Sequence, residues 1–183
     1  MLGLRRSALA GVATLAIALA SSARPAGALQ IVPSIGISRG ADGGDNRTMM
    51  AVGLRNGFLP RTQVELQVGY HSETHTFAGQ SFGVKTIPVT LSLWASPVPM
   101  LYAGGGVGAY PQAIDYQNNL YPASNHTQFG AHVGGGLRFP LAPMAALDLQ
   151  GRYVMLGQQT NQLTTGKFNP SFWTMSAGLA IGF

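Results

Sequence analysis

Three side chains of metal-binding type occur at every second position near the middle of the chain: His71, Glu73 and His75. Alternate residues of an extended strand point to the same face. Two imidazoles and a carboxylate would therefore converge there, as the ligands of zinc sites do. A hydrated strand end that runs into a polar loop accounts for the same residues without a metal. We adopt this second interpretation and keep the three residues as a candidate metal site.

The same segment places a histidine next to a serine, His71 and Ser72. These are the residue types of a catalytic base and its nucleophile. Adjacent residues of a strand point to opposite faces, so the pair is poorly placed for proton transfer. The sequence therefore indicates no catalytic residues.

Five charged residues stand among apolar and small residues in the rest of the chain: Arg55, Glu65, Arg138, Asp148 and Arg152. Arg55 and Glu65 flank one predicted turn, and Arg138 and Asp148 flank another. All five fall on the predicted inner faces of strands, where an unpaired charge would be costly. They predict a structural ion-pair network inside the fold. The alternative is a gate whose pairs rearrange to pass ions.

Two glycine triplets, residues 104–106 and 134–136, have the composition of phosphate-binding loops. Neither begins a helix, as such loops require. If the strands that carry the triplets pair symmetrically about Asn119, the triplets lie opposite one another. We then expect a stretch of wall without side chains, which allows sharp curvature or close packing of large inward side chains.

The first 28 residues have the three parts of a secretory signal peptide. Arg5 and Arg6 supply the positive charge, residues 8–20 form an apolar stretch too short to span a bilayer, and Ala26-Gly27-Ala28 is a small-residue cleavage site. We expect a signal peptide at 1–28, export by the general secretion route, and a single domain at 29–183.

The composition of the remaining chain excludes several classes of protein. The chain has 11 Lys and Arg residues, of which Arg5, Arg6 and Arg24 lie in the leader, so eight remain against six Asp and Glu. This small excess, without a run of like charge, does not favour nucleic-acid binding. The absence of cysteine excludes disulfides and thiolate metal sites. No segment after residue 28 has 18 consecutive apolar residues, so no transmembrane helix is predicted.

The last twelve residues, 172–183, show the clearest alternation of large and small side chains. One face carries Trp173, Met175, Ala177, Leu179, Ile181 and Phe183, and the other carries only small or weakly polar residues. A solvated strand would have a more polar second face. This pattern suits a strand with lipid outside and a crowded barrel lumen inside.

Seven other segments share this period-two alternation. The eight predicted strands cover approximately residues 30–38, 48–55, 63–71, 86–93, 100–110, 129–139, 147–155 and 172–183. Long polar connections alternate with short ones that mostly contain proline, and both chain ends fall on the short-turn side. Pro88 lacks a ladder donor, so it predicts a bulge or a local break in pairing. The sequence predicts an all-β fold: an eight-stranded antiparallel up-and-down transmembrane β-barrel.

Aromatic residues occur near both ends of the predicted strands, as in the interfacial girdles of such barrels. We expect Trp94, Phe139 and Phe183 in the girdle near the short turns. The expected girdle near the long loops consists of Tyr70, Tyr110, Phe129, Tyr153 and Trp173.

The alternation, the segment Pro99–Tyr110 (PMLYAGGGVGAY) and the terminal Phe183 give the whole chain after residue 28 a resemblance to a known family. It resembles the small eight-stranded bacterial outer-membrane barrels: the OmpA membrane domain, the OmpX and Ail group, and the opacity-type porin-family proteins. The resemblance implies a Gram-negative-type outer membrane as the location. It also implies a C-terminal assembly signal, formed here by Trp173, Met175, Leu179, Ile181 and Phe183.

The expected role is that of a non-enzymatic outer-membrane protein with a structural or narrow-pore function and surface-exposed loops. The partners implied are outer-membrane lipids and lipopolysaccharide, the barrel-assembly machinery, and an extracellular partner of the loops; no nucleic acid and no cofactor are expected. Two alternatives stay open. One is a lipid A-modifying enzyme of the deacylase or acyltransferase kind, and the other is a soluble exported barrel that binds an apolar ligand inside.

Overall fold

The computed structural model describes residues 29–41, 45–59, 61–77, 80–116, 124–157, 159–160, 167–168 and 170–183. The predicted signal peptide, residues 1–28, lies outside the described residues and remains a prediction. The described residues form strands and the turns between them. None of them forms a helix long and apolar enough to cross a membrane.

In the described ranges, strands are the regular secondary structure, and turns or short irregular segments connect them. They are β1 (Gln30–Gly40), β2 (Arg47–Leu59), β3 (Thr62–Phe77), β4 (Gln80–Thr86), β5 (Val89–Val98), β6 (Leu101–Tyr116), β7 (Ser124–Ala142), β8 (Ala145–Leu156), β9 (Gln159–Thr160), β10 (Lys167–Phe168) and β11 (Phe172–Gly182). The pair β9 and β10 forms a separate small sheet.

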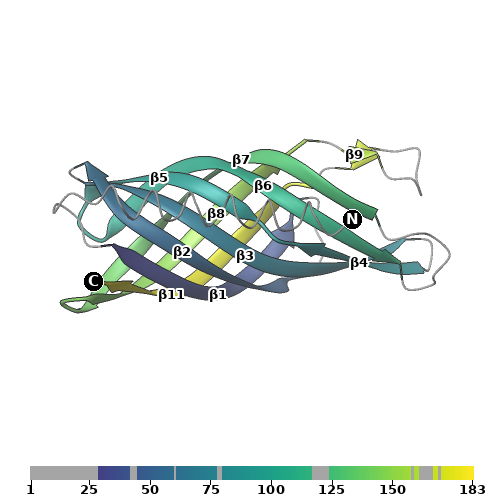
Figure 1. Cartoon of the computed structure of the whole chain (residues 1–183). Coiled ribbons are helices and arrows are strands. Elements are labelled where there is room, and N and C mark those ends of the chain that lie inside the picture. Colours follow the sequence, from purple (N-terminus) through teal and green to yellow (C-terminus); the bar gives the residue numbers. More distant parts are fainter. Residues whose placement is uncertain are drawn as a thin grey trace, which may run out of the picture.

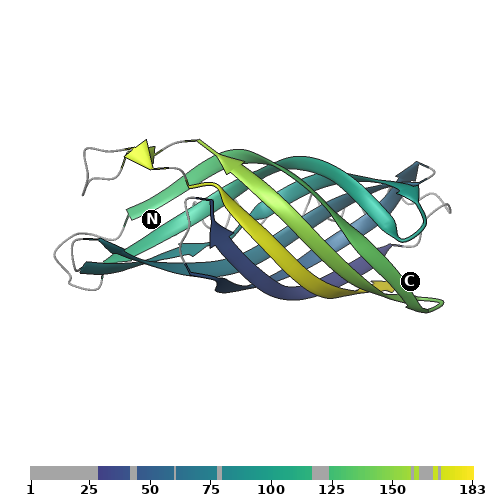
Figure 2. The same ribbon diagram turned by 180° about the vertical axis from the view of Figure 1, so that it is seen from behind.

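The remaining strands close into a barrel (Figure 1). If β4 and β5 are counted as two pieces of one wall strand, each wall strand pairs antiparallel with the next wall strand along the chain, and β1 pairs with β11, which closes the sheet. Figure 2 shows the last strand, β11, between β1 and β8 on the other side of the barrel. Closure leaves no sheet edge, so every wall strand has two neighbours, as a membrane-spanning sheet requires. The predicted eight-stranded antiparallel barrel is confirmed.

The interruption at Pro88 divides one wall strand into β4 and β5. Both pieces pair with β3 and with β6. The register is the same on both sides of the proline, because His71 faces Thr86 and Val68 faces Val89. The ladder is therefore broken locally without a bulge, which is one of the two outcomes expected from a residue that has no N–H to donate.

The two faces of the wall differ as the alternation predicted. Large apolar side chains are exposed on the outside, among them Ile35, Met50, Val107, Phe129, Trp173 and Met175. The inside holds buried polar and charged side chains, among them Arg55, Glu65, Thr90, Ser92, Asp148 and Arg152. This arrangement is the reverse of a soluble protein, and it contradicts the alternative of a soluble barrel with an apolar interior.

Two aromatic residues lie on the opposite face from the one we expected. Trp94 and Tyr110 were assigned to the lipid-facing girdles, but both are buried in the lumen. Trp94 has the same parity as Ser92 on β5, and Tyr110 the same parity as Tyr102 on β6, so the alternation itself points them inward. Among the other girdle residues, Phe129, Trp173 and Phe183 are exposed on the outer face.

The two ends of the barrel differ in how the strands are connected. At the short-turn end, β2 and β3 and likewise β5 and β6 are joined by tight turns, in which Arg61 and Met100 have positive φ angles of 63° and 72°. At the long-loop end, the strands extend well past the predicted limits, so that β3 reaches Phe77 and β6 reaches Tyr116. Barrels of this kind keep short turns on the periplasmic side and long loops outside.

Candidate functional site in the barrel lumen

The structure brings all five predicted luminal charges together near the short-turn end; we call these five residues the luminal network. Arg55 on β2 faces Glu65 on β3, and Arg138 on β7 faces Asp148 on β8. Each pair flanks a short turn, so local hairpin geometry is enough to place its members side by side. Arg152 lies four residues beyond Asp148 on the same inner face of β8.

Ion pairs across the lumen join these two hairpins. The Arg55 Nε donates to Glu65 Oε2 at 2.5 Å, and its Nη1 donates to Asp148 Oδ2 at 2.6 Å. The second oxygen of Glu65 accepts from Arg152 Nη2. Arg55 and Glu65 are 1% and 0% exposed, so these charged groups contact opposite charges instead of water. Such an exchange is stable only when every charge is paired.

Neutral side chains complete the hydrogen bonding of the network. The Tyr102 hydroxyl donates to Asp148 Oδ1 at 2.6 Å and accepts from Gln150 Nε2 at 3.1 Å. Arg152 Nε donates to Gln150 Oε1 at 2.7 Å. Arg138, which is partly exposed, lies 3.4 Å from Asp148 and donates to Gln63 at 3.0 Å. The polar groups therefore form one connected set, in which each member holds another in place.

Two inward aromatic rings pack against the guanidinium groups of the network. The guanidinium carbon of Arg152 lies 5.1 Å from the centre of the Trp94 ring. Arg55 and Arg138 lie 5.1 and 5.5 Å from the Tyr102 ring. The two rings meet edge to face, with centroids 5.5 Å apart. These distances allow cation–π attraction, and the rings occupy space between the charges in the narrow lumen.

The sequence analysis did not identify four residues that contact the luminal network: Gln63, Trp94, Tyr102 and Gln150. The parity of β5 and β6 was the available signal for both aromatic residues, because alternate residues of a strand point to the same face. For Trp94, the expected aromatic girdle was given more weight than the parity of the strand, and the outward assignment was wrong.

One glycine triplet makes room for Tyr102. Tyr102 faces Gly136 across β6 and β7, and a Cβ on that glycine would lie 2.5 Å from the tyrosine ring. Close packing of a large luminal side chain was the expected purpose of the triplets. Their predicted alignment is only partly correct, however, because Gly104 faces Gly134 while the other triplet residues are offset along the strands.

The half of the lumen nearer the long loops has a different character. Tyr110, Val154, Leu156 and Phe172 form an apolar cluster there, and the His71 ring lies 4.9 Å from the Phe172 ring. Between this cluster and the network, Ser92 Oγ and His132 Nε2 are hydrogen-bonded at 2.9 Å. Among the described residues, four buried atoms of this half have no hydrogen-bond partner: Ser38 Oγ, Tyr110 Oη, Gln128 Oε1 and His132 Nδ1.

The candidate metal residues are only partly described. His71 is buried in the lumen, whereas the side chains of Glu73 and His75 lie outside the described residues, as does that of Ser72. No group of three or more metal-ligating side chains occurs within the described part of the chain. The metal site therefore stays a candidate that the structure does not test.

An inside-out closed barrel with a charged lumen defines the class of transmembrane outer-membrane barrels. A comparison with family models agrees, because the outer membrane protein beta-barrel domain matches residues 7–180. The chain belongs to this family, and it is a protein of the bacterial outer membrane. No curated protein matches it at the level of sequence.

Solved structures with the same fold have little sequence in common with this chain. OprG of Pseudomonas aeruginosa is 14% identical with a TM-score of 0.63, and covers 85% of this chain and 96% of its own. Neisserial surface protein A is 15% identical with a TM-score of 0.61, covering 86% and 97%. A major outer membrane protein from Thermus thermophilus is 16% identical with a TM-score of 0.60, covering 86% and 100%. These similarities show the shared fold.

Proposed function

We propose that this protein is a non-enzymatic outer-membrane scaffold whose lumen is closed by the luminal network. The observation that carries the proposal is the pair of links across the lumen, from Arg55 to Asp148 and from Arg152 to Glu65. Trp94 and Tyr102 pack against the arginines of these links, so side chains occupy the lumen at this level. An eight-stranded barrel is just wide enough for side chains to fill it.

The non-enzymatic part of the proposal is supported by where the reactive side chains lie. Ser92 and His132 are the described pair most similar to a nucleophile and its base. They are 2% and 1% exposed and face the lumen, so a lipid substrate in the membrane does not reach them. Glu65 and Asp148 each accept from arginines, which leaves neither carboxylate available as a general base.

The remaining predicted partners, the barrel-assembly machinery and an extracellular partner of the loops, are part of this proposal. The residues of the predicted assembly signal support it through their placement. Trp173, Met175 and Phe183 are all more than half exposed on the outer face of the last strand, where another protein or lipid can contact them.

A planar-bilayer recording of the refolded protein tests the closed lumen. We expect no steady current from the wild type. A double variant, Glu65→Gln with Arg152→Gln, removes an ion pair and shortens the side chain at position 152, so it should show ion-conducting events. Leu93→Ala, on the lipid-facing side of β5, serves as a control and should stay silent. A steady ohmic current from the wild type would show that the protein is an open pore.

A gated narrow pore is the second candidate, and one observation favours it. The partnerless atoms Tyr110 Oη, Gln128 Oε1 and His132 Nδ1 lie between the long loops and the network. Buried polar atoms of this kind are commonly satisfied by ordered water. Water would then reach the network from outside, and rearrangement of the network alone would open the barrel. Voltage-dependent openings of the wild type in the same recording would identify this behaviour.

A further inference from the structure

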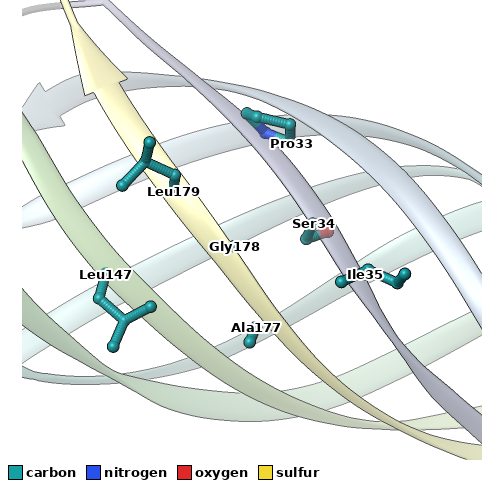
Figure 3. A pocket seen from close by; sticks show the side chains of 7 residues that line it. All are labelled: Pro33, Ser34, Ile35, Leu147, Ala177, Gly178 and Leu179. Carbon is teal, nitrogen blue, oxygen red and sulfur yellow. The ribbon is translucent and has the colours of Figure 1, made fainter.

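The outer wall of the barrel carries a groove where its first and last strands meet. Figure 3 shows the groove over β1, β11 and β8. Its floor is Ala177 and the backbone of Gly178, and its sides include Ile35, Leu147 and Leu179. The groove has a volume of about 430 Å³ and is open along the outer wall.

The sequence explains why the wall is hollow at this place. Ala177 is a small residue between two large outward ones, Met175 and Leu179, and it faces Ile35 across the seam. Pro33 on the neighbouring strand has no N–H to donate. The pairing of β1 with β11 passes from Ile31–Ile181 directly to Ser34–Gly178, so the ladder is interrupted beside the groove.

The groove is apolar and faces the hydrocarbon region. The one hydroxyl among its lining residues, that of Ser34, has the inward parity of β1 and donates to the Ala51 carbonyl at 3.3 Å, so it is satisfied within the protein. Ile35 and Leu179 on its sides are 58% and 39% exposed. A flexible apolar occupant, such as an acyl chain, is therefore favoured over a polar one.

The same strands present a cation on the outer face, toward the long-loop end. Arg39 is exposed and has the parity of Ile35 and Ile37, so it points away from the lumen. Within the described residues it has no carboxylate partner, whereas the three arginines of the luminal network are all ion-paired. An outward arginine at headgroup level that has no carboxylate partner among the described residues favours an external anion, and arginine suits phosphate in particular.

Aromatic rings adjoin this arginine. Arg39 faces Trp173, and Trp173 faces Tyr153. The two rings are 4.5 Å apart and inclined by 42°. Tryptophan and tyrosine lie preferentially at the boundary between headgroups and acyl chains, which places Arg39 at that boundary in the outer leaflet.

The spacing of the two features fits a single lipid molecule. Arg39 is four residues from Ile35, or about 13 Å along the strand, which corresponds to a depth of roughly 10 Å for a strand tilted by about 40°. One leaflet of the hydrocarbon core is about 15 Å thick. An acyl chain whose headgroup contacts Arg39 is therefore long enough to reach the groove.

We propose that the seam formed by β1, β11 and β8 is a binding site for the lipid A part of lipopolysaccharide. A lipid A phosphate would bind Arg39, and an acyl chain of the same molecule would fill the groove at Ala177. Lipid A is preferred to a glycerophospholipid because Arg39 lies at the long-loop end, where the outer leaflet carries lipopolysaccharide. The site depends on the wall of the barrel, so it holds whether or not the lumen conducts.

Native mass spectrometry of the refolded full chain, titrated with bisphosphorylated lipid A, tests this site. Arg39→Gln and Ala177→Leu should each weaken binding about tenfold, a change of one decade in Kd. Lys85→Gln, another exposed cation, and Ala131→Leu, the same enlargement on the outer face of β7, are the matched controls and should change Kd less than twofold. Lipid A without phosphates should bind the wild type as weakly as intact lipid A binds Arg39→Gln.

Three results would overturn the proposal. One is unchanged lipid A binding by both seam variants, and another is equally tight, Arg39-dependent binding of phosphatidylglycerol, which would make a glycerophospholipid the ligand. The third is a wild-type dimer that Ala177→Leu dissociates, which would make a second copy of the chain the occupant. A heat-dependent gel shift verifies folding of each variant, and if Ala177→Leu does not fold, the exposed Arg39→Gln decides alone.

Discussion

The two halves of the lumen fill the same barrel in different ways. Near the short turns, arginines and carboxylates are linked by ion pairs and packed against Tyr102 and Trp94. Near the long loops, Tyr110 and Phe172 lie with their ring centroids 6.1 Å apart, beside aliphatic side chains. The first half is held by connected polar interactions, and the second by apolar contact.

This difference determines how each half should respond to substitution. Removing one member of a connected buried network leaves its partners charged and unpaired, which is far more costly than the loss of one contact. Removing a polar atom that has no protein partner leaves no other polar group unsatisfied, so the loss of stability is small. The predictions below test this contrast, from the largest effect to the smallest.

Glu65→Ala should be the most destabilising of these changes. Glu65 accepts from both Arg55 and Arg152, so its removal leaves a buried excess of positive charge, and breaking such a pair costs about 3–5 kcal/mol. Urea unfolding of protein refolded into lipid vesicles measures the loss. Arg47→Ala is the control, because its ion pair with Asp45 at the long-loop end is solvent-exposed. Equal losses of stability in the two variants would contradict the contrast between the buried network and the long-loop end.

The two luminal tyrosines offer a matched comparison on a single strand, β6. Tyr102→Phe removes a hydroxyl bonded to Asp148, and hydrogen bonds to charged groups contribute about 1.5–3 kcal/mol. Tyr110→Phe removes a hydroxyl with no partner among the described residues, so the free energy of unfolding should hardly change. The same unfolding assay distinguishes them. A larger loss of stability for Tyr110→Phe would show that the half of the lumen near the long loops is also held by a polar network.

Gly136→Ala should destabilise the half near the short turns through steric overlap. The new methyl group would lie 2.5 Å from the Tyr102 ring and 2.3 Å from the Leu149 carbonyl oxygen, and overpacking of this kind costs about 1–3 kcal/mol. Gly151→Ala is the matched control, since its nearest neighbour, the Thr174 carbonyl oxygen, is 3.9 Å away. Unfolding midpoints in urea compare the two. A neutral Gly136→Ala would mean that Tyr102 is not tightly packed.

The fold could be predicted from the sequence because each strand must sort its residues between lipid and lumen. The alternation fixed which side chains of β3 and β8 point inward, and Pro88 marked the break between β4 and β5. The length of β3 could not be predicted in this way. Beyond Tyr70 both faces are polar, so the alternation ends although the hairpin continues to Phe77.

The candidate site was predictable only where its contacts are local. Arg55 with Glu65, and Arg138 with Asp148, follow from hairpins with short turns. The bond from Arg55 to Asp148 joins strands far apart in the sequence. It depends on how the closed sheet is staggered, and no local pattern records that stagger.

Thiol labelling tests the closed lumen most directly, because the chain contains no cysteine and single cysteines can be introduced without background. Gln112→Cys faces the lumen near the long loops, and Gln63→Cys lies on the short-turn side, beside Arg138. In proteoliposomes whose proteins have the long loops outside, an impermeant maleimide added outside should label Gln112→Cys. It should label Gln63→Cys only after the vesicles are opened. Rapid labelling of Gln63→Cys in sealed vesicles would contradict a lumen closed by the luminal network.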